Sequence, residues 1–303
     1  MTGARASTLL AAAVLILAVH PSLAGRASLA GQANAAPSLR VTWHPARPRV
    51  GAVAWLYVEG VAERATIEGS VGGRPLTFFP YGAGQATLVG FDLEAKAGAL
   101  PWSLAVVEAG AEPRAVRGRV TVQRHDFPVQ RLTLPPAMVD LDRETERRAA
   151  REGEHLRTLL RTISPERLWR GAFTHPLGAT VAGANFGSRR VINGQPRAPH
   201  GGADYTALQG TPVVTANAGR VALVADHFFP GRLVAIDHGL GLYTLYFHLE
   251  RASVSEGERV ERGQAIGAVG ATGRATGPHL HFAAQVGPAR VDPASLLALG
   301  MRD

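Results

Sequence analysis

Cysteine is absent from this 303-residue sequence. Disulfides, thiol nucleophiles and thiolate metal ligands are therefore excluded, and any metal ion must be held by histidine, aspartate or glutamate. Lysine is almost absent as well, because Lys96 is the only one, so arginine supplies nearly all of the positive charge behind the formal net charge of +8. A basic net charge of this kind is equally consistent with binding to an anionic partner and with a simple compositional preference for arginine. No basic run is interleaved with aromatic side chains, so nucleic-acid binding is not expected.

Long apolar runs are missing after the first twenty residues. Near the start, Arg5 precedes the run TLLAAAVLILAV, which is shorter than the ~20 residues of a membrane span. Small residues follow at 22–24 (SLA) and 33–35 (ANA), as at a cleavage site. We expect residues 1–35 to be a signal peptide, with an uncleaved anchor as the alternative, and no membrane span after cleavage. The protein is then exported to the periplasm or cell envelope.

Residues 37–129 contain short apolar runs at roughly ten-residue spacing, separated by glycine- and proline-containing turns. This pattern is typical of a small antiparallel sandwich, and we expect an Ig-like one. His44 and His125 stand alone in this segment, so we interpret them as structural or surface groups.

Residues 138–168 are rich in charge and in helix-forming residues, and we expect a helical linker. Leu156, Leu159, Leu160 and Ile163 follow the i, i+3, i+4, i+7 spacing of one apolar stripe. Glu144 and Arg148 are spaced to pair across one turn.

Residues 172–300 return to short strand-like runs divided by glycines, which predicts an antiparallel sheet domain. The whole chain is therefore expected to be mainly β: an N-terminal sandwich, a connecting helix and a C-terminal sheet domain. The sequence does not indicate an oligomeric state.

Two strand-like segments of this C-terminal region carry histidines. Alternation in LYTLYFHLE places His248 on the same face as Tyr246, opposite an apolar face. In HLHFAAQV it places His279 and His281 together, opposite a second apolar face. If both apolar faces cover one core, the three histidines look into a common space.

The segment PHGGADY supplies a carboxylate and a further imidazole. His200 and Asp204 are four residues apart, and the two glycines between them allow the chain to fold so that both side chains meet. Two histidines and an aspartate are a sound ligand set for zinc with an open fourth position. His279 and His281 stand about 7 Å apart along a strand. Spacing alone permits both to bind the metal, or one to bind while the other handles protons.

The remaining histidines of the region have simpler interpretations. His238 alternates with apolar residues and is expected to be a satisfied core or turn histidine, and His175 and His227 are expected to be structural. A Ser-His-Asp triad is disfavoured because the sequence has no G-x-S-x-G elbow.

Residues 173–297 resemble the M23 family of zinc metallopeptidases, of the lysostaphin and LytM type. The resemblance is carried, in the family's order, by FGSRRVINGQPRAPHGGAD, GTPVVTANAGRV, LVAIDHGLGLYTLYFHL, VSEGERVERGQAIGAVGATG and TGPHLHF. The sandwich and the helix resemble the N-terminal region of some exported members.

The resemblance implies a function and assigns the site residues. His200, Asp204 and His281 fall at the zinc-ligand positions, and His248 and His279 at those of the catalytic histidines. Members hydrolyse peptide bonds in peptidoglycan with a zinc-activated water, so one Zn2+ per chain and a peptidoglycan substrate are implied. The alternatives are a catalytically silent regulator of other wall hydrolases, which would lack ligands, and a wall-binding protein whose sandwich does the work.

Overall fold

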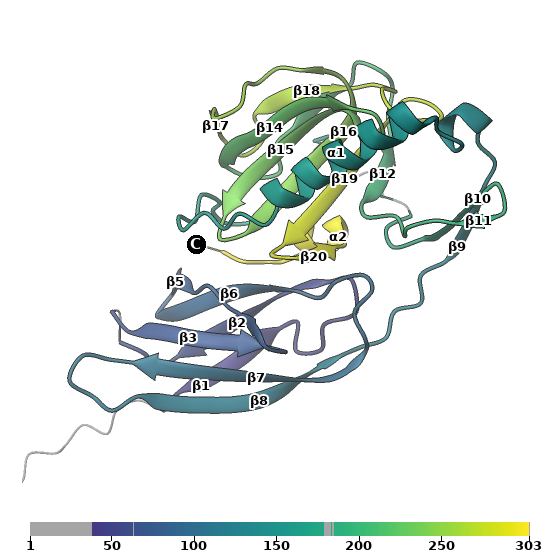
Figure 1. Cartoon of the computed structure of the whole chain (residues 1–303). Coiled ribbons are helices and arrows are strands. Elements are labelled where there is room, and N and C mark those ends of the chain that lie inside the picture. Colours follow the sequence, from purple (N-terminus) through teal and green to yellow (C-terminus); the bar gives the residue numbers. More distant parts are fainter. Residues whose placement is uncertain (1–37, 63, 179–182, 184, 303) are drawn as a thin grey trace, which may run out of the picture. The chain divides into compact units, whose positions relative to one another are not determined.

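The computed structural model describes residues 38–62, 64–178, 183 and 185–302. The predicted signal peptide at 1–35 lies outside these residues. Within them, no helix is both long enough and apolar enough to cross a bilayer. Antiparallel strands dominate, which confirms the mainly β class (Figure 1).

The first part of the described chain forms two four-stranded antiparallel sheets. One sheet has the strand order β1 (Arg40–His44), β2 (Val53–Glu59), β6 (Gly84–Gly90) and β5 (Phe79–Tyr81). The other has the order β4 (Arg74–Pro75), β3 (Thr66–Val71), β7 (Gly98–Val107) and β8 (Arg114–Val122). Apolar side chains of both sheets pack together, among them Leu56 of β2 and Leu104 of β7. The sandwich is as predicted from the strand spacing, and its Ig-like character stays a prediction.

A small sheet links this part to the rest of the chain. Strand β9 (Val129–Leu132) pairs in parallel with β10 (Arg189–Ile192), which pairs with β11 (Gln195–Pro196). Between β9 and β10 come a short 3-10 turn (Pro136–Met138) and helix α1 (Arg143–Leu159). The sequence-based domain boundaries remain predictions.

The C-terminal part is built on a sheet of nine described strands. Its main path runs β12 (Ala203–Thr206), β19 (His279–Val286), β16 (Leu242–Ala252), β15 (Gly231–Gly239), β14 (Gly219–His227) and β17 (Arg259–Val260). Strands β13 (Pro212–Val214), β18 (Ala265–Val269) and β20 (Ala289–Val291) pair with its members, and helix α2 (Pro293–Leu297) follows β20. All pairs in this sheet are antiparallel, as expected.

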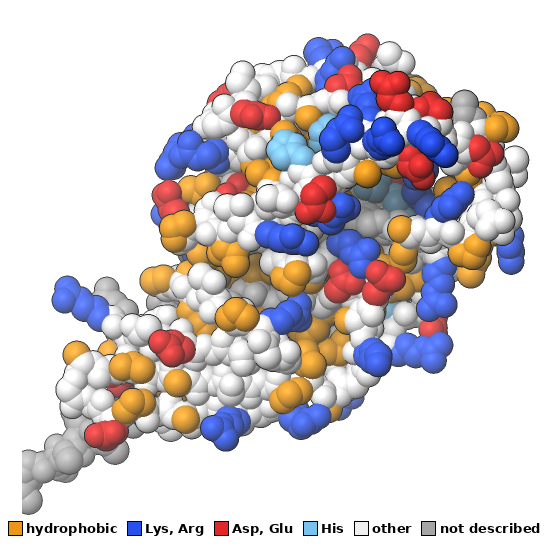
Figure 2. Space-filling model, viewed as in Figure 1, with side chains coloured by type: hydrophobic (Ala, Val, Ile, Leu, Met, Phe, Trp, Pro, Cys, Tyr) orange, Lys and Arg blue, Asp and Glu red, His pale blue; other side chains and the backbone are white. Residues whose placement is uncertain are grey.

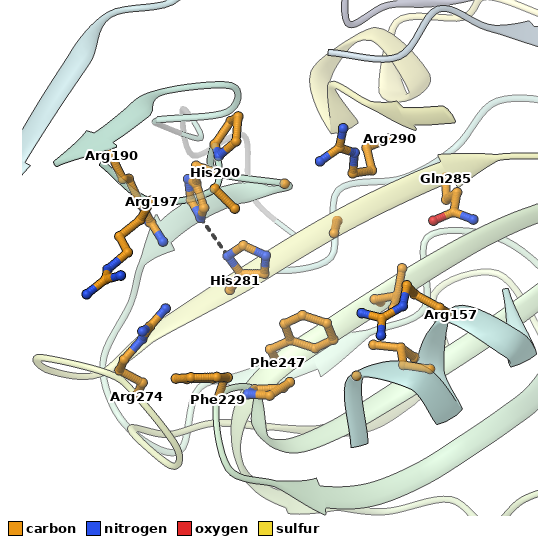
Figure 3. A pocket seen from close by; sticks show the side chains of 18 of the residues that line it. Arg157, Arg190, Arg197, His200, Phe229, Phe247, Arg274, His281, Gln285 and Arg290 are labelled. Atoms are coloured by element: carbon orange, nitrogen blue, oxygen red, sulfur yellow. Dashed lines mark hydrogen bonds between the residues drawn. The ribbon is translucent and has the colours of Figure 1, made fainter. Parts of the chain in front are cut away.

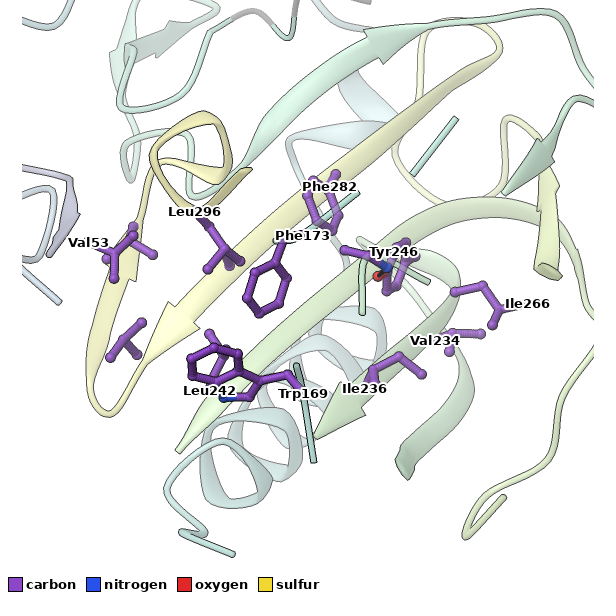
Figure 4. Close-up of a cluster of buried hydrophobic side chains, with 14 of the residues drawn as sticks. Val53, Trp169, Phe173, Val234, Ile236, Leu242, Tyr246, Ile266, Phe282 and Leu296 are labelled. Carbon is purple, nitrogen blue, oxygen red and sulfur yellow. Dashed lines mark hydrogen bonds between the residues drawn. The ribbon is translucent and has the colours of Figure 1, made fainter. Parts of the chain in front are cut away.

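Both faces of this sheet bury apolar side chains. On one face Leu280 and Phe282 of β19 join Tyr246 of β16 in the larger core (Figure 4). On the other face, Leu245 of β16 and Ala283 of β19 lie beneath α1. Two histidines discussed below, His248 and His281, line a groove that residues of α1 also line.

Helix α1 begins at a capping residue and ends earlier than the leucine stripe. The carboxylate of Asp142 accepts hydrogen bonds from two backbone N–H groups of the first turn, which satisfies donors that have no partner inside the helix. Leu160 packs against the sheet, but Ile163 is 56% exposed, so its predicted place in the stripe was wrong. Arg148 pairs with Glu152 rather than with Glu144.

Candidate metal centre and active site

Three potential metal ligands converge from separate segments. His200 lies in the turn between β11 and β12, Asp204 in β12 and His281 in β19. Asp204 and His281 are direct register partners across the two strands, so the sheet itself brings them together. His200 also reaches Asp204, as predicted, although neither Gly201 nor Gly202 between them has a left-handed backbone.

The donor atoms of these residues form a nearly equilateral triangle. His200 Nε2 lies 2.8 Å from His281 Nδ1 and 3.1 Å from Asp204 Oδ1, and the third edge, from His281 Nδ1 to Asp204 Oδ1, is 2.9 Å. Ligands 2.0–2.1 Å from a tetrahedral zinc are about 3.3 Å apart. The triangle is slightly smaller than that, so a small relaxation would fit a zinc ion to two nitrogens and one oxygen.

Neighbouring groups hold this triangle in place. His200 Nδ1 donates to the carbonyl of Asn185 at 2.9 Å, which directs its Nε2 lone pair at the centre. Arg190 lies 3.5 Å from the other carboxylate oxygen of Asp204. A Cβ at Gly202 would lie 2.6 Å from His281 Nε2, so only glycine leaves room for that ring.

Charge in the triangle favours a cation. Burial lowers the pKa of His281 to about 4, so its imidazole is neutral at physiological pH. Burial acts to raise the pKa of Asp204, but hydrogen bonds with His200 and His281 outweigh it, and the pKa falls well below its usual range. The carboxylate anion of Asp204 and the neutral imidazole of His281 are in the protonation states that metal ligands require.

His248 reaches the same place through a break in its strand. Its φ of 61° is left-handed, and the pairing of β16 with β15 shifts register beside it. Such a bulge re-aims a side chain. The prediction that His248 shares a face with Tyr246 was therefore wrong: Tyr246 is buried in the larger core, whereas His248 lines the groove beside the triangle.

His248 and His279 are fixed in the same manner. The Nδ1 atom of His248 donates to the carbonyl of Thr272 at 2.8 Å, and that of His279 donates to the carbonyl of Gly277 at 2.8 Å. Nε2 is therefore the nitrogen that each neutral ring can offer to a substrate. The two ring centres are 4.7 Å apart, and His279 Nε2 is 3.8 Å from Asp204 Oδ1.

A groove of about 560 Å³ runs from this cluster along the sheet to α1 (Figure 3). Phe247 forms part of its floor and stacks on the His281 ring, with centroids 5.1 Å apart and planes 9° from parallel. Sequence reasoning missed the role of Phe247, although the register that pairs it with His281 places both on one face.

The other histidines of the described residues, and Tyr246, lie outside the cluster. His238 is completely buried, and its Nδ1 and Nε2 lie 2.8 Å from the Ala218 carbonyl and the Thr244 hydroxyl, so its assignment as a satisfied core histidine is confirmed. Tyr246 is buried as well, and its hydroxyl accepts from the backbone N–H of Ala216. These contacts give Tyr246 a structural role.

Comparison with known proteins adds a family. Residues 198–293 match the model of peptidase family M23. The chain is 45% identical over 100 residues to the peptidoglycan DD-endopeptidase ShyA of Vibrio cholerae serotype O1, an alignment that covers 33% of this chain and 23% of that protein. It is 44% identical over 97 residues to the DD-carboxypeptidase/endopeptidase Mpg of Neisseria meningitidis serogroup B, covering 32% of this chain and 22% of the other. The chain thus spans less than a quarter of the length of these two relatives.

A solved structure resembles a larger share of the chain. A crystal structure from Pseudomonas aeruginosa, assigned to peptidase M23, superposes with a TM-score of 0.63 at 29% identity, covering 83% of this chain and 95% of the other. The matched region of the family model includes all five candidate site residues, His200, Asp204, His248, His279 and His281. Residues 198–293 are therefore identified as a peptidase M23 domain.

Proposed function

We propose that this chain is an exported zinc endopeptidase that hydrolyses peptide bonds in the stem-peptide cross-links of bacterial peptidoglycan. The observation that carries the proposal is the triangle of His200 Nε2, Asp204 Oδ1 and His281 Nδ1, with edges of 2.8–3.1 Å, beside two further histidines. The relatives named as peptidoglycan endopeptidases support the substrate class. A wall substrate agrees with export through the expected signal peptide.

The triangle is the place where zinc would be held. A zinc ion there would supply a Lewis acid that polarises the scissile carbonyl and lowers the pKa of water. Asp204 contributes the single negative charge of the ligand set. Arg190 contacts the Asp204 carboxylate, and the carbonyl of Asn185 accepts from His200 Nδ1, so both groups orient the ligands. With two nitrogens and one oxygen as protein ligands, a fourth position is left open for substrate and water.

His248 and His279 are the groups proposed to handle protons. Each ring is anchored through Nδ1, so Nε2 keeps a lone pair for accepting a proton or, once protonated, donates one to the leaving amine. Burial lowers the pKa of His248 to about 4, so it is neutral and able to act as a base near pH 7. Once protonated, the Nε2–H group of either ring can also stabilise negative charge on the carbonyl oxygen.

Two other functions make different demands on the chain. A silent regulator of other wall hydrolases would lack ligands, yet all five family positions hold the expected residues. A wall-binding protein acting through the sandwich would be insensitive to changes at His281, and deleting the sandwich would abolish its binding.

Digestion of purified peptidoglycan separates these functions. Zinc-loaded wild type should release peptide fragments that mass spectrometry assigns to cleaved cross-links, and His281→Ala should release none. His227→Ala is the matched control, because His227 is a buried histidine outside the cluster. Equal product release by wild type and His281→Ala would exclude the metalloenzyme, while a wild type that binds the wall without releasing products would favour the non-catalytic functions.

A further inference from the structure

The groove beside the metal triangle has an unbalanced charge. Its lining includes five arginines and no aspartate or glutamate: Arg157, Arg190, Arg197, Arg274 and Arg290. Figure 2 shows Lys and Arg side chains at the edge of a hollow in which histidine is visible. A concave surface lined by charge of one sign concentrates ligands of the opposite sign.

Two of these arginines, Arg157 of α1 and Arg290 of β20, are already neutralised. Arg157 donates two hydrogen bonds to the carboxylate of Glu154. Arg290 is held by Asp92 and Glu94 at 2.6–3.0 Å. These two side chains are therefore committed to partners within the protein and leave little charge for a ligand.

The arginines at the metal end are not neutralised to the same degree. Arg190 has a contact of 3.5 Å with Asp204, whose charge is shared with two histidines. For Arg197 and Arg274, the described part of the chain provides no ion pair with a carboxylate. Arg197 is exposed, and Arg274 is partly buried with its guanidinium 4.2 Å from the centre of the Phe229 ring.

These three guanidinium groups lie close enough to repel one another. Burial lowers the pKa of Arg274 first, and the charges of Arg190 and Arg197 lower it further. In Figure 3 the side chains of Arg197 and Arg274 point toward each other beside His281. Holding like charges together costs free energy that a bound anion would offset.

The backbone fixes Arg274 in this position. Its N–H donates to the carbonyl of Phe229 at 3.0 Å. The preceding residue, Gly273, has a φ of 70° and packs so tightly that an added Cβ would lie 2.2 Å from the backbone nitrogen of Gly231. The loop that delivers Arg274 is therefore built against the β14–β15 turn, and it leads directly into His279.

We propose that Arg197 and Arg274, next to Arg190, form a carboxylate-binding subsite that selects cross-links carrying a free carboxylate beside the scissile amide. The planar fork of a guanidinium matches a carboxylate through two parallel hydrogen bonds. The position of the subsite beside the metal ligands places that carboxylate within a few bonds of the hydrolysed amide. The proposal rests on the proposed peptidase function and adds to it the substrate feature that is recognised.

Two synthetic cross-linked peptide dimers provide the test, identical except that the carboxylate next to the cross-link amide is free in one and amidated in the other. The zinc-loaded full chain should cleave the free-carboxylate dimer with at least tenfold higher kcat/KM. Arg197→Gln and Arg274→Gln should each lower kcat/KM for that dimer by about ten- to a hundredfold and leave the amidated dimer within about twofold. Arg190 is not substituted, because it contacts Asp204.

Arg117→Gln is the control, because Arg117 is an exposed arginine of β8 and its loss changes the net charge equally. It should keep the wild-type preference, and zinc content should be the same in all variants. Equal losses on both dimers, or a wild type without preference, would overturn the subsite.

A wild type that cleaves neither dimer would refute the peptidase function. In that case, the affinity of the wild type and the variants for the two dimers tests the subsite independently. Fluorescence anisotropy with labelled dimers should show tighter binding of the free carboxylate, weakened by Arg274→Gln and by added salt. Equal affinities for the two dimers would by themselves reject carboxylate recognition, whatever the hydrolysis assay shows.

Discussion

Asp204 and His281 face each other directly across strands β12 and β19, with Asp204 Oδ1 2.9 Å from His281 Nδ1. Strand pairing therefore presets the proposed anionic ligand and one of the proposed imidazole ligands. Because the two side chains are already in place, metal binding costs less ordering entropy. Removing the negative charge of Asp204 should therefore lower metal affinity strongly.

Asp204→Asn keeps the side-chain shape but removes the negative charge from the ligand set. We expect zinc affinity to fall by about 100-fold or more, with loss of hydrolysis, because even supporting residues of a metal site contribute 10–100-fold. Zinc titration against a competing chelator measures the affinity. Asp126→Asn is the control, since Asp126 is an exposed carboxylate paired with Arg124. Unchanged zinc affinity in Asp204→Asn would remove Asp204 from the ligand set.

The glycine pair before Asp204 provides a matched steric test. A Cβ at Gly202 would lie 2.6 Å from both His281 Nε2 and the carbonyl oxygen of Phe282, whereas a Cβ at Gly201 meets nothing within 4 Å. Gly202→Ala should displace His281 and weaken zinc binding by roughly tenfold or more. Gly201→Ala should bind zinc as the wild type does. Similar affinities for the two variants would show that the ring does not need this space.

Much of this site follows from local patterns in the sequence. Alternation correctly places His279 and His281 on one face of β19, because Leu280 and Phe282 are buried on the other. The meeting of His200 with Asp204 was also predicted, but its reason differs, because neither intervening glycine is left-handed and Gly202 instead leaves room for His281. These features depend only on neighbouring residues, which a single sequence displays.

The features that escaped prediction depend on contacts between distant segments. The pairing of Asp204 with His281 joins strands 77 residues apart, and nothing local specifies its register. The left-handed backbone at His248 breaks alternation, and its imidazole is held by the carbonyl of Thr272 in another loop. Histidine is among the residues that adopt this conformation more often than most, which was the one available signal.

Substitution of the two anchored histidines should separate catalysis from metal binding. His248→Gln and His279→Gln should each bind one zinc per chain but lose about 10²- to 10⁴-fold in kcat, the usual contribution of a positioned acid or base. Metal analysis and peptidoglycan hydrolysis on the same samples provide the two readings. Loss of zinc from either variant would instead assign that histidine to the metal.

Tyr246 should matter for stability and not for turnover. Its buried hydroxyl accepts from the N–H of Ala216 at 2.8 Å and lies 3.0 Å from the hydroxyl of Thr244. Tyr246→Phe leaves a buried N–H without this partner, so the free energy of unfolding should fall by about 1–3 kcal/mol with kcat unchanged. Tyr57→Phe is the control, because the described residues offer its hydroxyl no hydrogen bond. A lowered kcat at full stability would restore a catalytic role.

His238 should make the fold sensitive to mild acid. Burial lowers its pKa to about 4, while hydrogen bonding to the Ala218 carbonyl partly opposes that shift. In the unfolded chain it titrates near its ordinary pKa of ~6.5, so between pH 6.5 and 4 only the unfolded state gains the proton. The contribution of neutral His238 to the free energy of unfolding is therefore fully present above pH 6.5. It is lost as the pH falls, by roughly 3 kcal/mol at pH 4. Chemical denaturation in the presence of a chelator, which excludes effects of metal release, measures this for wild type and His238→Gln. The stability difference between them should shrink by that amount from pH 7 to pH 4, and a difference independent of pH would mean that folding leaves the pKa of His238 unchanged.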